Sequence, residues 1–330
     1  MRRLLTAALA AAALFAGPAV ADDFKPAVIF DIGGKFDKSF NEAAYNGAEK
    51  FKAETGIAYS EFEVTQESQR EQSLRKLAQR GATVIVATGF AQAPALKTVA
   101  AEYPKVKFVI IDDVVDLPNV QSVIFKEHEG SFLVGTLAAL ASKTGKVGFV
   151  GGMDIPLIRK FGCGYVQGVK YANPSAEVFE NMTGTTGEAW NDPTKGGELA
   201  RSQFDRGADV VYAAAGATGL GVYQAAKDAG KLAIGVDSNQ NYIHPGTMLT
   251  SMLKRVDLAT YNAFKTAQDG TWKPGLQTLG LAEDGVGWAL DDNNKPLVTP
   301  DMQAKVDQAK ADIVSGKIKV HDYTSDNTCP

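Results

Sequence analysis

The chain has 330 residues, 45% of them hydrophobic and 22% charged, a balance typical of a folded globular protein long enough for two domains. Its 34 Lys and Arg against 38 Asp and Glu give a net charge of −4, and no run of five basic residues occurs, so a nucleic-acid partner is not expected. Three His and two Cys are too few and too scattered for a zinc cluster, so no metal site is expected.

The first 21 residues have the pattern of a secretory signal peptide. Arg2 and Arg3 are followed by the apolar run 4–16 and by the small-x-small cleavage site 19–21, flanks that disfavour the alternative of an apolar first helix of the fold. No Cys follows the expected cleavage site, so a lipid anchor is not expected. No later run reaches the length of a membrane span, so we expect a mature protein that is soluble outside the cytoplasm.

Cys163 and Cys329 are the two cysteines of the chain. An oxidising compartment favours their pairing, which would tie the C-terminus back to the middle of the chain. Two free thiols are the alternative.

The remainder of the chain alternates apolar runs typical of strands with segments of helical period. Strands are predicted at 27–30, 58–64, 83–87, 107–111 and 120–125, with helices between the first four at 41–55, 69–80 and 91–103. The second half has predicted strands at 146–150, 177–182, 210–214, 232–236 and 247–252, with similar spacing. This alternation predicts an α/β fold with parallel sheets, laid down twice as two lobes of the same architecture.

Three further helices are predicted at 129–142, where the chain passes from one lobe to the other, at 256–269, after its return, and at 300–315. The expected division is a signal peptide (1–21), an N-terminal lobe (22–124 and 250–288) and a C-terminal lobe (125–249 and 289–330).

Polar and aromatic residues follow the predicted strands of the first half, where open parallel sheets bind ligands. The loop 31–41 (DIGGKFDKSFN) offers Phe36 as an apolar plate and Asn41 as an amide directed inward. The alternative is that Phe36 fills a gap in the core while Ser39 and Asn41 cap the following helix. Asp112, at the end of the fourth strand, is a candidate carboxylate facing the cleft.

The second half offers a matching set. Trp190 lies in a long loop and is a candidate plate, because an exposed Trp loses burial unless something covers it. Gly216 lets a ligand approach the backbone, and Asp237 is an acceptor suited to a pair of sugar hydroxyls. Lys254 follows the strand after which the chain should recross between the lobes.

Catalytic motifs are absent from the sequence: no G-x-S-x-G, H-E-x-x-H or Walker A pattern occurs. Residues 162–168 (GCGYVQG) resemble a dinucleotide fingerprint, but they lie within a predicted helix and indicate small packing positions. The closely spaced Asp run of a calcium-dependent nucleoside hydrolase is missing after the first strand. We therefore expect a binding protein without a cofactor rather than an enzyme.

Several segments, in order along the chain, resemble one family. They are FDIGGKFDKSFNEAAYNG (30–47), FVIID (108–112), VGFVGG (147–152), WNDPTKG (190–196), AAAG (213–216), IGVDSNQ (234–240) and TSMLKR (250–255). Over nearly the whole mature chain the sequence is similar to the basic membrane protein family, the purine-nucleoside receptor type of ABC-transporter substrate-binding protein.

The resemblance implies a type I periplasmic binding protein, with two doubly wound lobes joined by three crossing strands. It also implies a ligand set: Phe36 and Trp190 around the base, Asn41 and Asp112 at the purine edge, and Gly216, Asp237 and Lys254 at the ribose. The second plate is more often Phe in this family, so Trp190 is a departure that would alter stacking strength or base preference.

The partners implied are a purine nucleoside, captured by closure of the hinge, and the permease subunits of an inner-membrane ABC transporter. No lipobox follows the signal peptide, so a freely diffusing periplasmic protein is expected. A monomer is expected because soluble binding proteins are commonly monomers. Two alternatives stay open. The first is a receptor of the same fold that binds another flat heterocycle such as riboflavin, or that reports to a chemoreceptor instead of a transporter. The second is a nucleoside-cleaving enzyme on the same fold.

Overall fold

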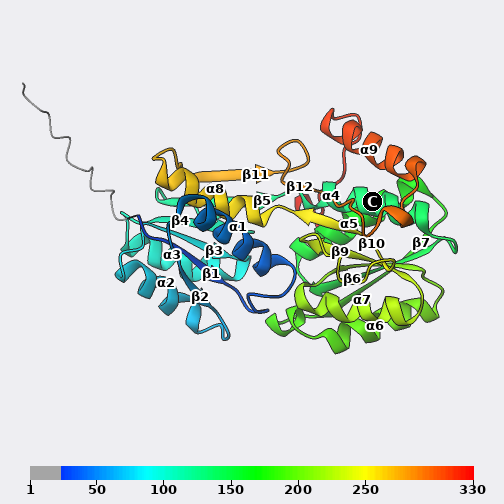
Figure 1. Ribbon diagram of the computed structural model, residues 1–330, viewed down its shortest axis with the longest axis horizontal. Coiled ribbons are helices and arrows are strands. Elements are labelled where there is room, and N and C mark those ends of the chain that lie inside the picture. Colours follow the sequence, from blue (N-terminus) through cyan, green and yellow to red (C-terminus); the bar gives the residue numbers. More distant parts are fainter. Residues whose placement is uncertain (1–23) are drawn as a thin grey trace, which may run out of the picture.

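The computed structural model describes residues 24–330 as two lobes, each a sheet with helices on both faces (Figure 1). The expected signal peptide lies outside the described residues. The first sheet contains β1 (Pro26–Phe30), β2 (Ser60–Glu63), β3 (Val84–Thr88), β4 (Lys107–Ile111), β5 (Val120–Phe125) and β11 (Gly275–Leu279). Its spatial order is β11-β5-β4-β3-β1-β2, and all its pairings are parallel.

The second sheet repeats this arrangement. It contains β6 (Lys146–Met153), β7 (Glu177–Gly184), β8 (Val210–Ala214), β9 (Leu232–Asp237), β10 (Met248–Lys254) and β12 (Val286–Trp288). The order is β12-β10-β9-β8-β6-β7, in which β12 is antiparallel to β10 and the other pairings are parallel. The prediction of two doubly wound lobes with one architecture is confirmed.

In the first lobe, α1 (Phe40–Thr55) packs with α8 (Val256–Gln268) on one face of the sheet, and α2 (Gln69–Gln79) packs with α3 (Ala93–Glu102) on the other (Figure 1). Successive side chains of a strand point to opposite faces. Val28 and Phe30 accordingly join the core beneath α1, whereas Ala27 and Ile29 join the core beneath α2 and α3. Burial on both faces explains why the central strands β1, β3 and β4 read as continuous apolar runs.

In the second lobe, α4 (Glu127–Ala141) and α5 (Pro156–Ala172) cover one face, and α6 (Pro193–Asp205) and α7 (Gly219–Asp228) cover the other. A final helix, α9 (Pro300–Val314), packs on α4. A Cβ atom at Gly164 or Gly168 would lie only 2.4 or 2.0 Å from the backbone oxygen of His128 or Phe132 in α4. The glycines of the fingerprint-like segment are therefore packing positions that let α4 and α5 approach closely.

The chain crosses between the lobes three times: after β5, after β10 and between β11 and β12. The expected boundaries at 250 and 288 differ from these crossings. Strand β10 pairs with β9 and β12 up to Lys254, so it stays whole in the second sheet and the chain leaves at Arg255. Strand β12 also belongs to the second sheet. Neither β11 nor β12 was expected, because the exposed β11 and the three-residue β12 carry no apolar run.

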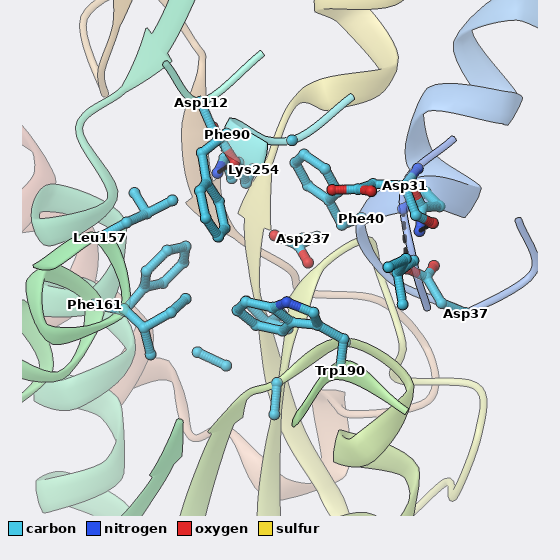
Figure 2. A pocket seen from close by; sticks show the side chains of 18 residues that line it. Asp31, Asp37, Phe40, Phe90, Asp112, Leu157, Phe161, Trp190, Asp237 and Lys254 are labelled. Atoms are coloured by element: carbon cyan, nitrogen blue, oxygen red, sulfur yellow. Dashed lines mark hydrogen bonds and ion pairs between the residues drawn. The ribbon is translucent and has the colours of Figure 1, made fainter. Parts of the chain in front are cut away.

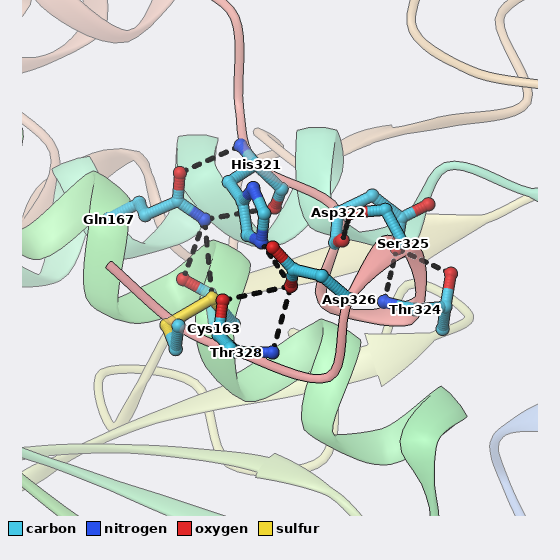
Figure 3. The surroundings of a disulfide bond; sticks show 9 residues. Cys163, Gln167, His321, Asp322, Thr324, Ser325, Asp326 and Thr328 are labelled. Carbon is cyan, nitrogen blue, oxygen red and sulfur yellow. Dashed lines mark hydrogen bonds and ion pairs between the residues drawn. A yellow bond between two sulfur atoms is a disulfide. The ribbon is translucent and has the colours of Figure 1, made fainter.

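The C-terminal tail returns to α5. Cys163 of α5 and Cys329 are joined as a disulfide, and Gln167 exchanges hydrogen bonds of 2.8 and 3.0 Å with the backbone of His321 (Figure 3). Between these contacts lies the short 3-10 helix η5 (Tyr323–Ser325). Among residues 24–330, none of the helices has the length and apolar character needed to cross a membrane.

Candidate functional site

A cavity lies between the two lobes, at the carboxyl ends of their strands. It holds about 620 Å³ of space that no protein atom occupies, part of it open to solvent. Its lining comes from the segments that follow β1, β3, β4 and β8, from the last residues of β8, β9 and β10, from α5, and from the short 3-10 helix η2 (Gly187–Trp190). This is the position, and the size, of a small-molecule site in open α/β sheets.

Six of the seven residues expected to bind the ligand line this cavity. They are Asn41, Asp112, Trp190, Gly216, Asp237 and Lys254. These residues come from six separate segments of the chain, and the two lobes bring them together.

Phe36 does not line the cavity, and its expected place beside the ligand is corrected here. Its side chain is 59% exposed and packs edge-on against Tyr45, with ring centroids 5.2 Å apart. The loop turns through positive φ at Gly33, Gly34 and Lys38, so the aromatic that faces the cavity is Phe40, the first residue of α1.

Phe90 lines the cavity from the 3-10 helix η1 (Phe90–Gln92) and was also not expected. It follows the predicted strand 83–87 by three residues, so the strand-end rule that singled out the other positions would have found it. In Figure 2, Phe40 and Phe90 lie on one side of the pocket and Trp190 on the other.

Asp37 organises the loop at the start of α1. Its carboxylate accepts the backbone N–H groups of Ser39, Asn41 and Glu42 at 2.8, 3.0 and 3.1 Å. Ser39 stands at the N-cap position, but its side chain makes no capping hydrogen bond, so the capping alternative for Ser39 is wrong. Burial raises the pKa of Asp37 to about 7, against the effect of the three N–H donors.

Asn41 braces the end of β1. Its Oδ1 accepts the backbone N–H of Asp31 at 3.1 Å and the hydroxyl of Thr88 at 3.2 Å, while Nδ2 donates to the carbonyl of Asp31 at 3.1 Å. An amide has two N–H donors, and within residues 24–330 these contacts use one of them. Asn41 also lines the cavity.

Asp112, directly after β4, and Asp237, the last residue of β9, adopt the left-handed conformation, with φ of +74° and +64°. Non-glycine residues adopt this conformation rarely, and it is often found at functional sites. Lys254 lies 2.6 Å from Asp112 Oδ2, whereas Oδ1 of the same carboxylate is buried and has no hydrogen-bond partner among the described residues. A buried acceptor without a donor on the wall of a cavity is a position for a ligand N–H or O–H.

The charges around Asp112 act in opposite directions. Burial raises its pKa to about 6, assisted by the negative charges of Glu127 and Asp237 and opposed by Lys254. Burial likewise raises the pKa of Asp237, which Lys254 and a hydrogen bond from Ser39 oppose. Burial alone would lower the pKa of Lys254, but Asp112, Glu127 and Asp237 outweigh it and raise that pKa, so the ammonium stays charged.

Trp190 is held in place from beneath. A Cβ atom at Gly152 of β6 would lie 2.2 Å from the indole, so the ring packs directly on this backbone. The hydroxyl of Thr218 donates to the carbonyl of Ala189 at 2.8 Å, and Gly216, with φ of +57°, lies against the backbone of Trp190. The indole is therefore a fixed plate on the floor of the cavity in Figure 2.

Hydrogen bonds join the lobes beside the cavity. Ser39 donates to the carboxylate of Asp237, Ser238 donates to the carbonyl of Ser39 at 3.0 Å, and Gln240 donates to the carbonyl of Lys38 at 3.0 Å. The loop before α1 is thus attached to the end of β9, and the structure has its lobes closed on one another.

The duplicated fold and the interlobe cavity define a solute-binding protein of the two-lobe, type I architecture. The chain is similar to an ABC transporter solute-binding protein from Aeropyrum pernix, 31% identical with a TM-score of 0.82 over 91% of this chain and 93% of that one. The chain belongs to the Bmp family of PnrA-like ABC transporter substrate-binding proteins, whose profile matches residues 24–324.

Two relatives illustrate the family. The ABC transporter nucleoside-binding protein BmpA of Lactococcus lactis is 32% identical over 91% of this chain and 90% of its own length. An uncharacterized lipoprotein of Pyrococcus abyssi is 38% identical over 81% of this chain and 69% of its own length.

Proposed function

We propose that this protein binds a purine nucleoside between its lobes and delivers it to the permease of an ABC importer. The observation that carries the proposal is the combination, in one cavity, of aromatic side chains from both lobes with a buried acceptor oxygen of Asp112 that has no hydrogen-bond partner among residues 24–330. Flat rings suit the aromatic walls, and donors on a base or sugar suit the acceptor. The L. lactis relative is named a nucleoside-binding protein, which supports the same ligand class.

In this proposal the base lies between Trp190 and the first-lobe aromatics Phe40 and Phe90. An aromatic pair contributes about 0.5–1.5 kcal/mol beyond the area it buries. Asn41 and Asp112 bind the edge of the base, and an analogue without the matching donor leaves a buried acceptor unpaired, which costs about 1–3 kcal/mol.

The ribose lies toward Gly216, Asp237 and Lys254. Hydrogen bonds to charged groups contribute about 1.5–3 kcal/mol each, so the sugar hydroxyls add both affinity and discrimination. Because the ligand contacts both lobes only when they are closed, it stabilises the closed form in proportion to those contacts. The permease then receives the closed, loaded monomer.

The place of action proposed is the periplasm, reached through the signal peptide at 1–21 and without a lipid anchor. The P. abyssi relative is named a lipoprotein, so the anchoring needs its own test. Intact mass spectrometry of the protein recovered from a cell envelope separates the two forms: a mass beginning at residue 22 supports the proposal, and an acylated mass contradicts it.

The binding test uses purified mature protein stripped of its own ligand by denaturation and refolding. Small molecules released at denaturation are identified by mass spectrometry, and the stripped protein is titrated calorimetrically with adenosine, guanosine, inosine, cytidine and riboflavin. We expect one-to-one binding of at least one purine nucleoside, which is recovered unchanged after long incubation. A preference for riboflavin would favour the flat-heterocycle alternative, and release of free base would show an enzyme.

A further inference from the structure

A row of buried charges leads away from the cavity. Lys254 lies 2.6 Å from Asp112 and 3.0 Å from Glu127, and Glu127 lies 2.9 Å from Lys160. The side chains of Lys254, Glu127 and Lys160 are 2%, 1% and 7% exposed. Of these four residues, Asp112 and Lys254 line the cavity. Glu127 and Lys160 lie behind them, so any effect they have on a ligand is transmitted through Lys254.

These charges lie where the chain passes between the lobes. Glu127 is the first residue of α4 and follows β5 by two residues, and Lys254 is the last residue of β10, directly before the second crossing. Lys160 of α5 also donates to the carbonyl of Phe125, the last residue of β5, at 2.8 Å. Two of the three crossings are therefore joined by one set of buried ion pairs.

The row ends on the C-terminal tail. Asp322 Oδ2 lies 3.8 Å from Lys160 Nζ and 3.9 Å from His128 Nδ1. Two contacts hold the tail over α5: the Cys163–Cys329 disulfide and the hydrogen bonds of Gln167 with His321 (Figure 3). Asp322 lies between His321 and Cys329 in sequence.

We propose that Glu127, Lys160 and Asp322 are positioning residues that hold Lys254, and through it the Asp112 carboxylate, in the geometry that binds the ligand. The inference rests on the proposed function, since it concerns the affinity of that same cavity. None of the three touches the space the ligand would fill, and each acts through the next charge in the row.

The physical reason is the alternation of sign along the row. Lys254, Glu127 and Lys160 each have an opposite charge on either side, and removing one charge leaves its neighbours uncompensated, which is strongly unfavourable in a buried site. Without the carboxylate of Glu127, the ammonium of Lys254 has Asp112 and Asp237 as its remaining anionic neighbours. Lys254 then moves further toward these two carboxylates and competes with the ligand for them.

The first test compares inosine affinity in the full mature chain carrying Glu127→Gln with the wild type. We expect the dissociation constant to rise about tenfold or more, because a partner of a buried charge is lost. Circular dichroism and the unfolding midpoint, measured on the same sample, show whether the variant is folded at the temperature of titration.

A pH profile separates positioning from a merely structural role. The negative charge of Glu127 is one of the causes that raise the pKa of Asp112. Its removal should therefore move the acid limb of inosine binding to lower pH, while Asp237, Lys254, Lys160, Asp322 and His128, the other titratable groups along the row, are unchanged in sequence. A folded variant that binds more weakly but keeps the wild-type pH profile would contradict positioning by Glu127.

Asp322→Asn provides a second variant that leaves the fully buried charges intact, and Asp326→Asn is its matched control. Asp326 lies in the same tail but is half-exposed, and among residues 24–330 its carboxylate bonds with Thr328 and His321. We expect Asp322→Asn to weaken inosine binding several-fold and Asp326→Asn to leave it unchanged. Unchanged affinity in both Glu127→Gln and Asp322→Asn overturns the inference alone, whereas a wild type that binds no nucleoside overturns the proposed function and this inference with it.

Discussion

Within the part of the chain that the structure describes, four carboxylates and one ammonium line the cavity. Asp31 is neutralised by Arg70 at 3.0 Å, Asp37 accepts three backbone N–H groups, and Asp112 is paired with Lys254. Asp237 of the second lobe receives a hydrogen bond from Ser39 of the first. Such a cavity offers acceptors to a neutral ligand rich in N–H and O–H groups and disfavours a phosphorylated one by charge repulsion.

The pKa of Asp112 predicts how binding depends on pH. Burial raises this pKa to about 6 from its usual 3.8, and the ionised carboxylate is the form that accepts two hydrogen bonds. Inosine affinity should therefore be constant well above pH 6, where Asp112 is ionised. It should fall as the pH drops through this value, by up to about tenfold per pH unit. Calorimetric titrations between pH 5 and 8 measure the profile.

Asp112→Asn is the control for this prediction. It should bind inosine more weakly at pH 8 and lose the acid limb attributable to Asp112, because the amide does not titrate. A wild-type affinity that is constant from pH 8 to pH 5 would show that Asp112 is not a ligand acceptor.

The two aromatics of the first loop should behave differently. Phe40→Ala removes a ring that lines the cavity and should weaken inosine binding about tenfold, from lost burial and stacking. Phe36→Ala removes an exposed ring that lies outside the lining and should change the affinity less than twofold. Calorimetric titration of the two variants with inosine shows which ring contacts the ligand. A larger loss of affinity with Phe36→Ala than with Phe40→Ala would restore the expected role of Phe36.

At the scale of secondary structure, the contact between α4 and α5 determines where the charges behind the cavity lie. Close approach of the two helices at Gly164 and Gly168 places Glu127, at the start of α4, beside Lys160 of α5. A side chain at either glycine would force the helices apart, and with them the two partners of this ion pair.

Gly168→Ala tests this packing. The new Cβ atom would lie 2.0 Å from the backbone oxygen of Phe132, which cannot move independently of its helix, so the free energy of unfolding should fall by about 1–3 kcal/mol. Gly287→Ala in β12 is the matched control, because a Cβ atom there meets no atom within 4 Å. Urea unfolding of both variants measures the difference, and equal stabilities would show that α4 and α5 readjust freely.

The whole molecule is held closed by contacts between the loop before α1 and the end of β9. Ser39 is fully buried and makes two of them, through its hydroxyl to Asp237 and through its carbonyl to Ser238. We call these contacts the seam between the lobes. A ligand that touches both lobes also stabilises the closed form, so the seam and the ligand should stabilise it together.

Ser39→Ala should therefore loosen closure. Loss of a hydrogen bond to a charged group is worth about 1.5–3 kcal/mol, so we expect inosine affinity to fall about tenfold or more and the ligand-free protein to become more open. Small-angle X-ray scattering gives the radius of gyration with and without inosine. Ser175→Ala, which alters an exposed hydroxyl bonded within its own turn, should match the wild type in both measurements. A ligand-free Ser39→Ala protein as compact as the wild type would contradict this role for the seam.

Local patterns along the chain were sufficient for the architecture and for most of the cavity. Apolar runs and helical periods depend on neighbouring residues, so they placed ten strands, most of the helices and the repeat of the lobes. Parallel strands bring their carboxyl ends to one edge, so the positions after or at the ends of strands marked Asn41, Asp112, Trp190, Gly216 and Asp237 as candidates, and all five line the cavity.

Tertiary structure decided what no local pattern carries. The direction of Phe36 and Phe40 depends on a loop with positive φ at three positions, and β11 and β12 exist only through pairing with strands far away in sequence. The row formed by Asp112, Glu127, Lys160 and Lys254 joins residues separated by up to 142 positions. The position of a charged residue in the sequence does not indicate whether water or an opposite charge will surround it. Its burial and its ion-pair partner are set only when the chain folds.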